Sequence, residues 1–187
     1  MKIILGSNSP RRKELLAEMG YSFEVRVNSF EEKIDKQLPI DRIPEDIALQ
    51  KVKHLTPTQK KDECIICADT LVFLEGQVLG KPKSEREAKE MLMKLSGKTH
   101  TVITGVALSY QDKIETFQVQ TQVSFKSLSP SIIDEYIEKH SPLDKAGSYG
   151  IQDWIGLIAV QSIEGSYTNV VGLPTAQLHQ ELSKIKA

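Results

Sequence analysis

Residues 3–16 read IILGSNSPRRKELL, and this stretch predicts a short buried strand followed at once by a helix. Ser9 is a residue type that caps helices well, and Pro10 suits the first helical position. Arg11 and Arg12 then fall in the first turn, where the helix dipole disfavours each cation by about 0.3–1 kcal/mol. Two interpretations follow. Hydroxyls, backbone N–H groups and guanidiniums grip a polyphosphate here, or two solvated arginines lie on a surface helix.

The composition indicates a globular protein without a strong overall field. The chain has 187 residues, 40% of them hydrophobic and 26% charged, with a net charge of −1. Such a charge recruits neither nucleic acid nor an anionic membrane, so we expect neither as a partner. The sequence shows no apolar run near the roughly 20 residues that span a bilayer and no long apolar leader segment. We therefore expect a cytoplasmic protein.

Strand and helix patterns alternate along the chain and predict a mixed α/β fold, for which two lobes around a cleft are one arrangement. Long alternating segments at 99–110 and 113–126 predict two antiparallel strands joined by a tight turn. The other predicted strands are 3–5, 23–27, 64–68, 71–74, 77–79, 157–162 and 167–171, and the predicted helices are one after Ser9, 44–55, 84–97, one from Ser129 and one from Thr175.

Carboxylates stand at the predicted ends of two strands. Asp69 directly follows the apolar run 64–68, where it could hold Mg²⁺ or orient a water, or simply cap a turn. Glu31 and Glu32 end another strand and could supply a second carboxylate, or form a solvated pair. The role of Asp69 alone, or of Glu31 and Glu32 alone, is ambiguous. Together, these carboxylates indicate a site for a divalent cation.

Two loops carry further polar groups. Lys81 lies between Gly80 and Pro82, which either aims its ammonium or forms an ordinary surface turn. Residues 144–152 read DKAGSYGIQ, a composition that suits a loop closing over a ligand, and Gln152 offers the donor and acceptor that a base edge requires. The polar groups together indicate an anion, a divalent cation and a positioned water.

Other kinds of chemistry are disfavoured by the sequence. Cys64 and Cys67 form a C-x-x-C within a predicted strand, which points their side chains to opposite faces, so we expect buried, unpaired thiols. The four histidines lack ligand spacing, and no phosphate-binding P-loop or nucleophile-elbow motif is present.

Over nearly its whole length the chain resembles the Maf (septum formation inhibitor homologue) nucleoside triphosphate pyrophosphatases. The resemblance rests on many short motifs in order and at family-like spacing. These are S-x-S-P-R-R-x-E-L-L at 7–16, E-E-K at 31–33, A-D-T at 68–70, G-K-P at 80–82, L-S-G-K-T-H-x-V-x-T at 95–104, D-K-A-G-S-Y-G-I-Q at 144–152, G-S-Y at 165–167 and V-G-L-P at 171–174.

The resemblance implies a fold and an activity. The fold would be a single α/β domain over 1–187, an elongated two-lobed mixed sheet with flanking helices and a central cleft, similar to inosine triphosphate pyrophosphatases. The activity would be hydrolysis of a nucleoside triphosphate between the α and β phosphates. A divalent metal, Mg²⁺ or Mn²⁺, would assist, and a homodimer is the family habit.

The resemblance also implies roles for particular residues. Asp69 matches the proton acceptor, and with Glu32 it would hold the metal. Arg11, Thr70 and Gln152 match positions linked to substrate choice in the subgroup that acts on dTTP and UTP. The positions that line the phosphate cleft correspond to Ser9, Arg12, Lys51 and Lys81.

Two other functions use the same residue types. A regulator of cell division or septum formation could bind nucleotides without turning them over. A nucleotidyltransferase also needs arginines, lysines and carboxylates, but it requires an acceptor other than water.

Overall fold

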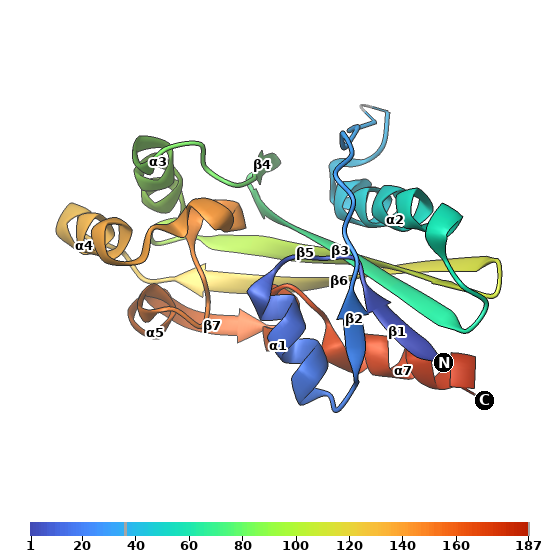
Figure 1. Cartoon of the computed structure of the whole chain (residues 1–187). Helices are drawn as coiled ribbons and strands as arrows, with labels where there is room; N and C mark the ends of the chain where they lie inside the picture. The colour runs from blue at the N-terminus through green and yellow to red at the C-terminus, as the bar shows by residue number, and fades with distance from the viewer. Residues whose placement is uncertain (36, 187) are drawn as a thin grey trace. The chain divides into compact units, whose positions relative to one another are not determined.

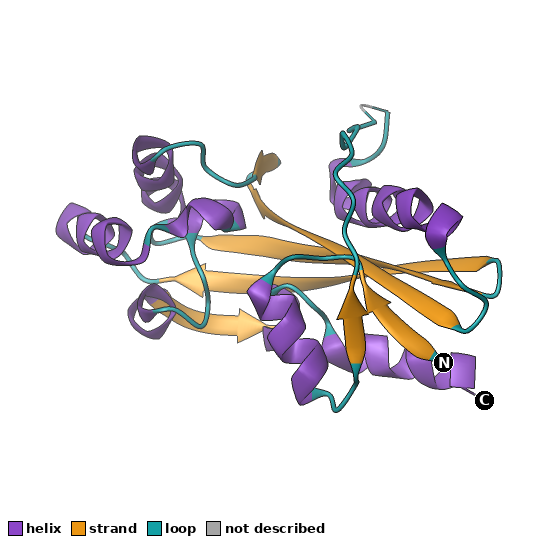
Figure 2. Cartoon of the chain, in the orientation of Figure 1, coloured by secondary structure: helices purple, strands orange, loops and turns teal. Residues whose placement is uncertain are grey.

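The computed structural model describes residues 1–35 and 37–186 and shows the mixed α/β fold that the sequence predicts (Figure 2). Its seven strands form one sheet in the order β2-β1-β3-β5-β6-β7, with β4 paired to β3, as counted over these described residues. The strands are β1 (Lys2–Leu5), β2 (Phe23–Val25), β3 (Glu63–Leu74), β4 (Gln77–Leu79), β5 (Thr99–Tyr110), β6 (Lys113–Phe125) and β7 (Val160–Glu164). The α-helices are α1 (Pro10–Glu18), α2 (Ile43–Leu55), α3 (Glu85–Leu95), α4 (Pro130–His140), α5 (Trp154–Ala159), α6 (Tyr167–Val171) and α7 (Thr175–Lys186).

The chain forms two compact units. The first contains Met1–Thr70, Thr104–Val119 and the chain from Gly172 onward, and the second contains Leu71–Ile103 and Gln120–Val171.

In the first unit, β1 lies between β2 and β3 and is parallel to both. Figure 1 shows α2 on one side of these strands and α1 and α7 on the other. The α2 side is filled by one apolar cluster, made of Ile4, Ala48, Val52, Leu55, Ile65, Cys67 and Ala107. Both cysteines are buried free thiols, as predicted, and burial raises the pKa of each to about 12. They are therefore packing residues.

The second unit has its own core, in which α3 and α4 supply the main apolar stripes. The buried members from these two helices are Ala88, Leu92, Leu95, Ile133, Tyr136 and Ile137. Helix α3 is capped by Ser84, whose Oγ accepts the Glu87 N–H at 3.2 Å. The Glu87 carboxylate accepts from the N–H of Lys83 at 2.7 Å, which anchors the chain just before the helix.

Two predicted strands near the C-terminal part of this unit are wrong in detail. Residues 167–171 form α6, because Ser166 Oγ accepts the Asn169 N–H at 3.2 Å and starts a helical turn. The Asn169 side chain then bonds to the carbonyl oxygen of Val102 at 3.1 Å, a distant contact that overrides local strand propensity. The strand predicted at 157–162 begins only at Val160, after α5.

Strand β3 is longer than predicted, and this corrects the position of Asp69. The predicted strand 64–68 continues to Leu74, because its last residues pair with β4 from Val72 onward. Asp69 therefore lies within a strand. Its neighbour β1 ends at Leu5, which pairs with Ile66, so β3 loses this neighbour just before Asp69. Asp69 therefore lies beyond the point where β1 ends but within β3.

Candidate functional site

Most of the predicted site residues belong to the first unit, and the remaining two belong to the second. The first unit holds Ser9, Arg11, Arg12, Glu32, Lys51, Asp69 and Thr70, and the second holds Lys81 and Gln152.

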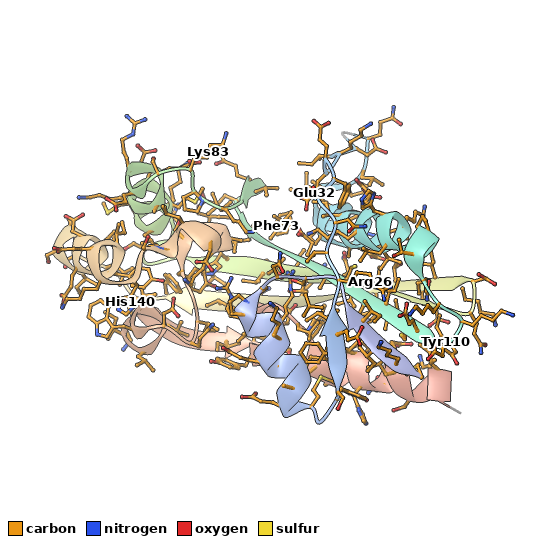
Figure 3. The ribbon with its side chains drawn as sticks, in the orientation of Figure 1. Arg26, Glu32, Phe73, Lys83, Tyr110 and His140 are labelled. Carbon is orange, nitrogen blue, oxygen red and sulfur yellow. The ribbon has the colours of Figure 1, made fainter. Side chains whose placement is uncertain are left out.

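One lysine joins the two predicted acidic residues. Lys51 Nζ lies 2.6 Å from Asp69 Oδ1 and 3.1 Å from Glu32 Oε1. The Asp69 and Lys51 side chains are 16% and 19% exposed, whereas Glu32 is 44% exposed. Figure 3 shows Glu32 beside α2, the helix that carries Lys51. The structure therefore brings Asp69, Glu32 and Lys51 together into one charged cluster, which we call the acidic–lysine cluster.

The direction of Asp69 follows from strand geometry. Side chains alternate along a strand, so Asp69 points to the same face as Ile65 and Cys67. That face is covered by α2, which contributes Val52 and Leu55 to the apolar cluster and Lys51 at its edge.

A pocket of about 220 Å³ adjoins the acidic–lysine cluster. It is lined by Gly6, Val27, Asn28, Ser29, Phe30, Glu32, Lys51 and Leu55. Gly6 permits close packing here, because a Cβ at this position would collide with Cys67 Sγ and lie 2.8 Å from Leu55 Cδ1. Lys51 therefore borders an open space as well as the two carboxylates.

Arg12 is held by three groups of the protein. Its Nε donates to the carbonyl oxygen of Gly172 at 2.8 Å, its Nη2 to Thr70 Oγ1 at 3.1 Å, and its Nη1 to Ser7 Oγ at 3.3 Å. Burial lowers the pKa of Arg12, while the Asp69 carboxylate opposes this effect. A guanidinium stays protonated in proteins and has five N–H donors, so Arg12 is a fixed positive charge with more donors than these three bonds use.

Two residues that help to position Arg12 carried no role in the sequence interpretation: Thr104 and Gly172 occur there only as motif letters. Ser7 was expected to contribute a hydroxyl to a phosphate, and in the structure this hydroxyl contacts Arg12. Thr104 Oγ1 lies 2.9 Å from Thr70 Oγ1, and Gly172 has a φ of 126°, a conformation that favours glycine. Gly172 is 160 residues from Arg12 in sequence, so no local pattern could link the two.

The start of α1 matches its predicted position but not the predicted cap. Ser9 is the N-cap residue and Pro10 the first helical residue, and the first turn contains no acidic side chain. The Ser9 hydroxyl makes no capping bond, whereas the Ser9 N–H donates to Ser7 Oγ at 3.2 Å. Arg11 lies half-buried in this first turn, as predicted. The helix therefore presents its positive end together with two arginines.

In the second unit, the loops that carry Lys81 and Gln152 are tied to each other. The N–H of Gly147 donates to the carbonyl oxygen of Gly80 at 3.0 Å. Lys81 and Gln152 are both exposed. The neighbouring Asp153 accepts the Tyr136 hydroxyl at 3.0 Å, which fixes the end of the 144–152 loop.

A family model described as "Maf-like protein" matches residues 2–185. The chain belongs to this family. A dTTP/UTP pyrophosphatase of Phocaeicola vulgatus is 51% identical over 185 residues, covering 98% of this chain and 96% of the relative. A dTTP/UTP pyrophosphatase of Bacteroides thetaiotaomicron is 44% identical over 188 residues, covering 98% and 96%.

The fold of this Maf-like protein also occurs in a solved structure. The Staphylococcus aureus Ham1 protein superimposes with a TM-score of 0.57 at 14% identity, over 100% of both chains. Within the described parts of the chain, no helix is long and apolar enough to cross a membrane.

The residues of this Maf-like protein fit a divalent metal, which the resemblance implies. Asp69 and Glu32 direct carboxylate oxygens at one cation, the Lys51 ammonium, so the pair is arranged to face positive charge. Among residues 1–35 and 37–186, no group of three or more Asp, Glu, His or Cys side chains could hold a metal. Two carboxylates suit an ion that takes its other oxygens from water and substrate phosphates, as Mg²⁺ commonly does.

Proposed function

We propose that this Maf-like protein hydrolyses dTTP and UTP between the α and β phosphates and releases the monophosphate and pyrophosphate. The names of its full-length relatives support this substrate class. The observation that carries the proposal is the acidic–lysine cluster, in which a half-buried carboxylate is held by a lysine close to the fixed charge of Arg12.

The phosphate chain would bind at the start of α1. Unsatisfied N–H groups and the helix dipole favour an anion there, and Arg11 and Arg12 add charge-assisted hydrogen bonds. Arg12 would act as a preorganised cation, because Gly172, Thr70 and Ser7 already fix its orientation. Such a group stabilises developing charge without reorganising during the reaction.

Asp69 would orient the attacking water and accept its proton. The β3 backbone on either side of Asp69 fixes the direction of its side chain, and in the free protein Lys51 also restrains one carboxylate oxygen. The other oxygen can accept a hydrogen bond from a water aligned with the α phosphorus. As in other phosphoryl chemistry, positioning and electrostatics would supply most of the acceleration.

A divalent ion held by Asp69 and Glu32 would neutralise charge on the phosphate oxygens when bound. Contacts of Lys81 to phosphate and of Gln152 to the base stay predictions.

The proposal is tested by incubating the purified full chain with Mg²⁺ and each common or modified triphosphate, with separate assays for pyrophosphate, inorganic phosphate and monophosphate. We expect equal amounts of pyrophosphate and monophosphate, fastest with dTTP and UTP. Asp69→Asn should lose this activity, whereas the control Asp62→Asn, at an exposed residue just before β3, should keep it. Binding without pyrophosphate release would favour a regulator, and release only with a second acceptor would favour a nucleotidyltransferase.

A further inference from the structure

Lys51 occupies the position at which the two predicted metal ligands converge. Its ammonium contacts both Asp69 and Glu32 at hydrogen-bonding distance. We infer that the Lys51 ammonium occupies the metal position in the free protein and so weakens the binding of a divalent metal there. When the triphosphate binds, Lys51 moves away from Asp69 and Glu32 and leaves them to the metal. This inference rests on the proposed function, since it concerns the metal and the phosphates of that same site.

In the free protein, a metal ion meets carboxylates that already have a partner. The Lys51 ammonium lies 2.6 Å from the Asp69 carboxylate and 3.1 Å from that of Glu32. Arg12 adds a second positive charge, on which Asp69 exerts the strongest charge–charge effect. A divalent ion must displace the Lys51 ammonium, and it approaches two carboxylates whose negative charge Lys51 and Arg12 already neutralise. Its affinity for the free protein is therefore low.

A triphosphate changes this balance because it offers Lys51 another partner. A lysine ammonium sits on a flexible stem with three rotatable donors, so it can move to a phosphate oxygen without a change of backbone. The adjoining pocket of about 220 Å³, which Lys51 and Glu32 both line, gives it room to do so. Once Lys51 has moved, Asp69 and Glu32 are available to the metal. Because such coupling is reciprocal, the metal in turn raises the affinity for the triphosphate.

A second ion pair in the same unit shows what a purely structural pair looks like. Glu63 is fully buried and accepts from Arg26 through two parallel bonds at 2.7 and 2.8 Å. Lys51 instead makes single contacts to two different carboxylates, one of which, that of Glu32, is 44% exposed. The Lys51 contacts are thus arranged for exchange of partners, whereas the Arg26–Glu63 pair is arranged for rigidity.

The experiment measures Mn²⁺ binding to the nucleotide-free full chain by the loss of the free Mn²⁺ EPR signal. Lys51→Met should bind Mn²⁺ roughly tenfold more tightly than the wild type, since one opposing unit charge is removed. Lys53→Met, which removes an exposed lysine from the same helix, should match the wild type. Glu32→Gln added to Lys51→Met should abolish the gain, because it removes one of the two ligands. Equal Mn²⁺ affinity in Lys51→Met and wild type would overturn the inference.

A second measurement uses the wild type alone and so does not depend on the folding of Lys51→Met. In ¹⁵N NMR of the lysine ammonium groups, a dUTP analogue with an α,β-imido bridge and Mg²⁺ should shift the Lys51 signal, whereas Mg²⁺ alone should leave it unchanged. A Lys51 signal that the analogue does not move would overturn the inference. Neither readout requires hydrolysis. Failure of the pyrophosphate assay would therefore refute the proposed function alone, whereas tighter Mn²⁺ binding by Lys51→Met would still support the role of Lys51.

Discussion

Replacing Glu63 by glutamine tests how strongly one buried ion pair stabilises the first unit. Glu63 lies at the start of β3, and its carboxylate accepts from Arg26 Nη1 and Nη2 and from the Lys60 N–H at 2.9 Å. Figure 3 shows Arg26 where the chain leaves β2. The Arg26 hydrogen bonds, opposed by burial and assisted by Lys60, lower the pKa of Glu63 to about 2.

The size of the effect follows from this pKa. A lowering from 4.5 to about 2 corresponds to about 3 kcal/mol, since one pKa unit is worth about 1.4 kcal/mol. Because Arg26 is still 24% exposed, solvent screening reduces the expected stabilisation to about 2 kcal/mol. The folded-state pKa is the lower one, so this stabilisation is complete above pH 4.5 and is lost as the pH falls toward 2.

The assay is urea unfolding of wild type and Glu63→Gln, followed by circular dichroism and by the fluorescence of Trp154, near neutral pH and near pH 3. Agreement of the two probes supports a two-state treatment. We expect the variant to be about 2 kcal/mol less stable at neutral pH, and this gap to shrink in acid. Glu24→Gln is the control, because Glu24 pairs with Lys2 while 59% exposed and should cost well under about 1 kcal/mol. A gap that is the same at both pH values would refute the reasoning.

Four further predictions concern two site residues, the packing at Gly6 and the buried His100. Asp69→Asn should keep the fold by circular dichroism but lower turnover by about 10²–10⁴, and near-normal turnover would remove Asp69 from the proposed role. Arg12→Lys keeps the positive charge but loses the planar guanidinium that donates to three protein groups. The kcat/KM for several triphosphates should therefore fall roughly tenfold or more. Unchanged kinetics would contradict the role of Arg12 as a preorganised cation. Gly6→Ala should lower the unfolding free energy by about 1–3 kcal/mol, because the added Cβ collides with Cys67 Sγ. In a double-mutant cycle, adding Cys67→Ala to the same chain should remove most of this loss. Burial lowers the pKa of His100 from 6.5 to about 4. The unfolding free energy of the wild type should therefore fall by up to about 3 kcal/mol between pH 6.5 and pH 4. Unfolding curves of His100→Gln, measured in parallel, should not show this decrease.

Elements with strong local patterns were predictable from the sequence. The helix expected at 84–97 is α3, because its cap at Ser84 and its apolar stripe need no distant partner. The hairpin of β5 and β6 turns at Gln111 and Asp112, whose positive φ values of 48° and 64° suit a tight turn. Residues 167–171 were predicted as a strand because their valines and tyrosine favour one, but the cap from Ser166 and the bonds of Asn169 to distant groups form a helix instead.

The site divides in the same way. The α1 arginines could be found from the sequence, because their misfit with the helix dipole is a local signal. The contact of Lys51 with Asp69 could not, since an ordinary helix lysine and an ordinary strand carboxylate meet only through the packing of α2 on β3. Without the family resemblance, no rule of spacing would have selected Lys51 from the other lysines of the chain.

Strand β3 separates the two cations of the proposed reaction, Arg12 and Lys51. Asp69 and Thr70 are consecutive, so their side chains point to opposite faces of the strand. Asp69 faces α2 and is held by Lys51, whereas Thr70 contacts Arg12 from α1. The Asp69 carboxylate is still the leading charge that acts on Arg12, so the two groups remain electrostatically coupled. The consecutive residues Asp69 and Thr70 thus separate an arginine held by three protein groups from a lysine that borders a pocket. In the proposed reaction, this separation would let Lys51 change partners without disturbing Arg12.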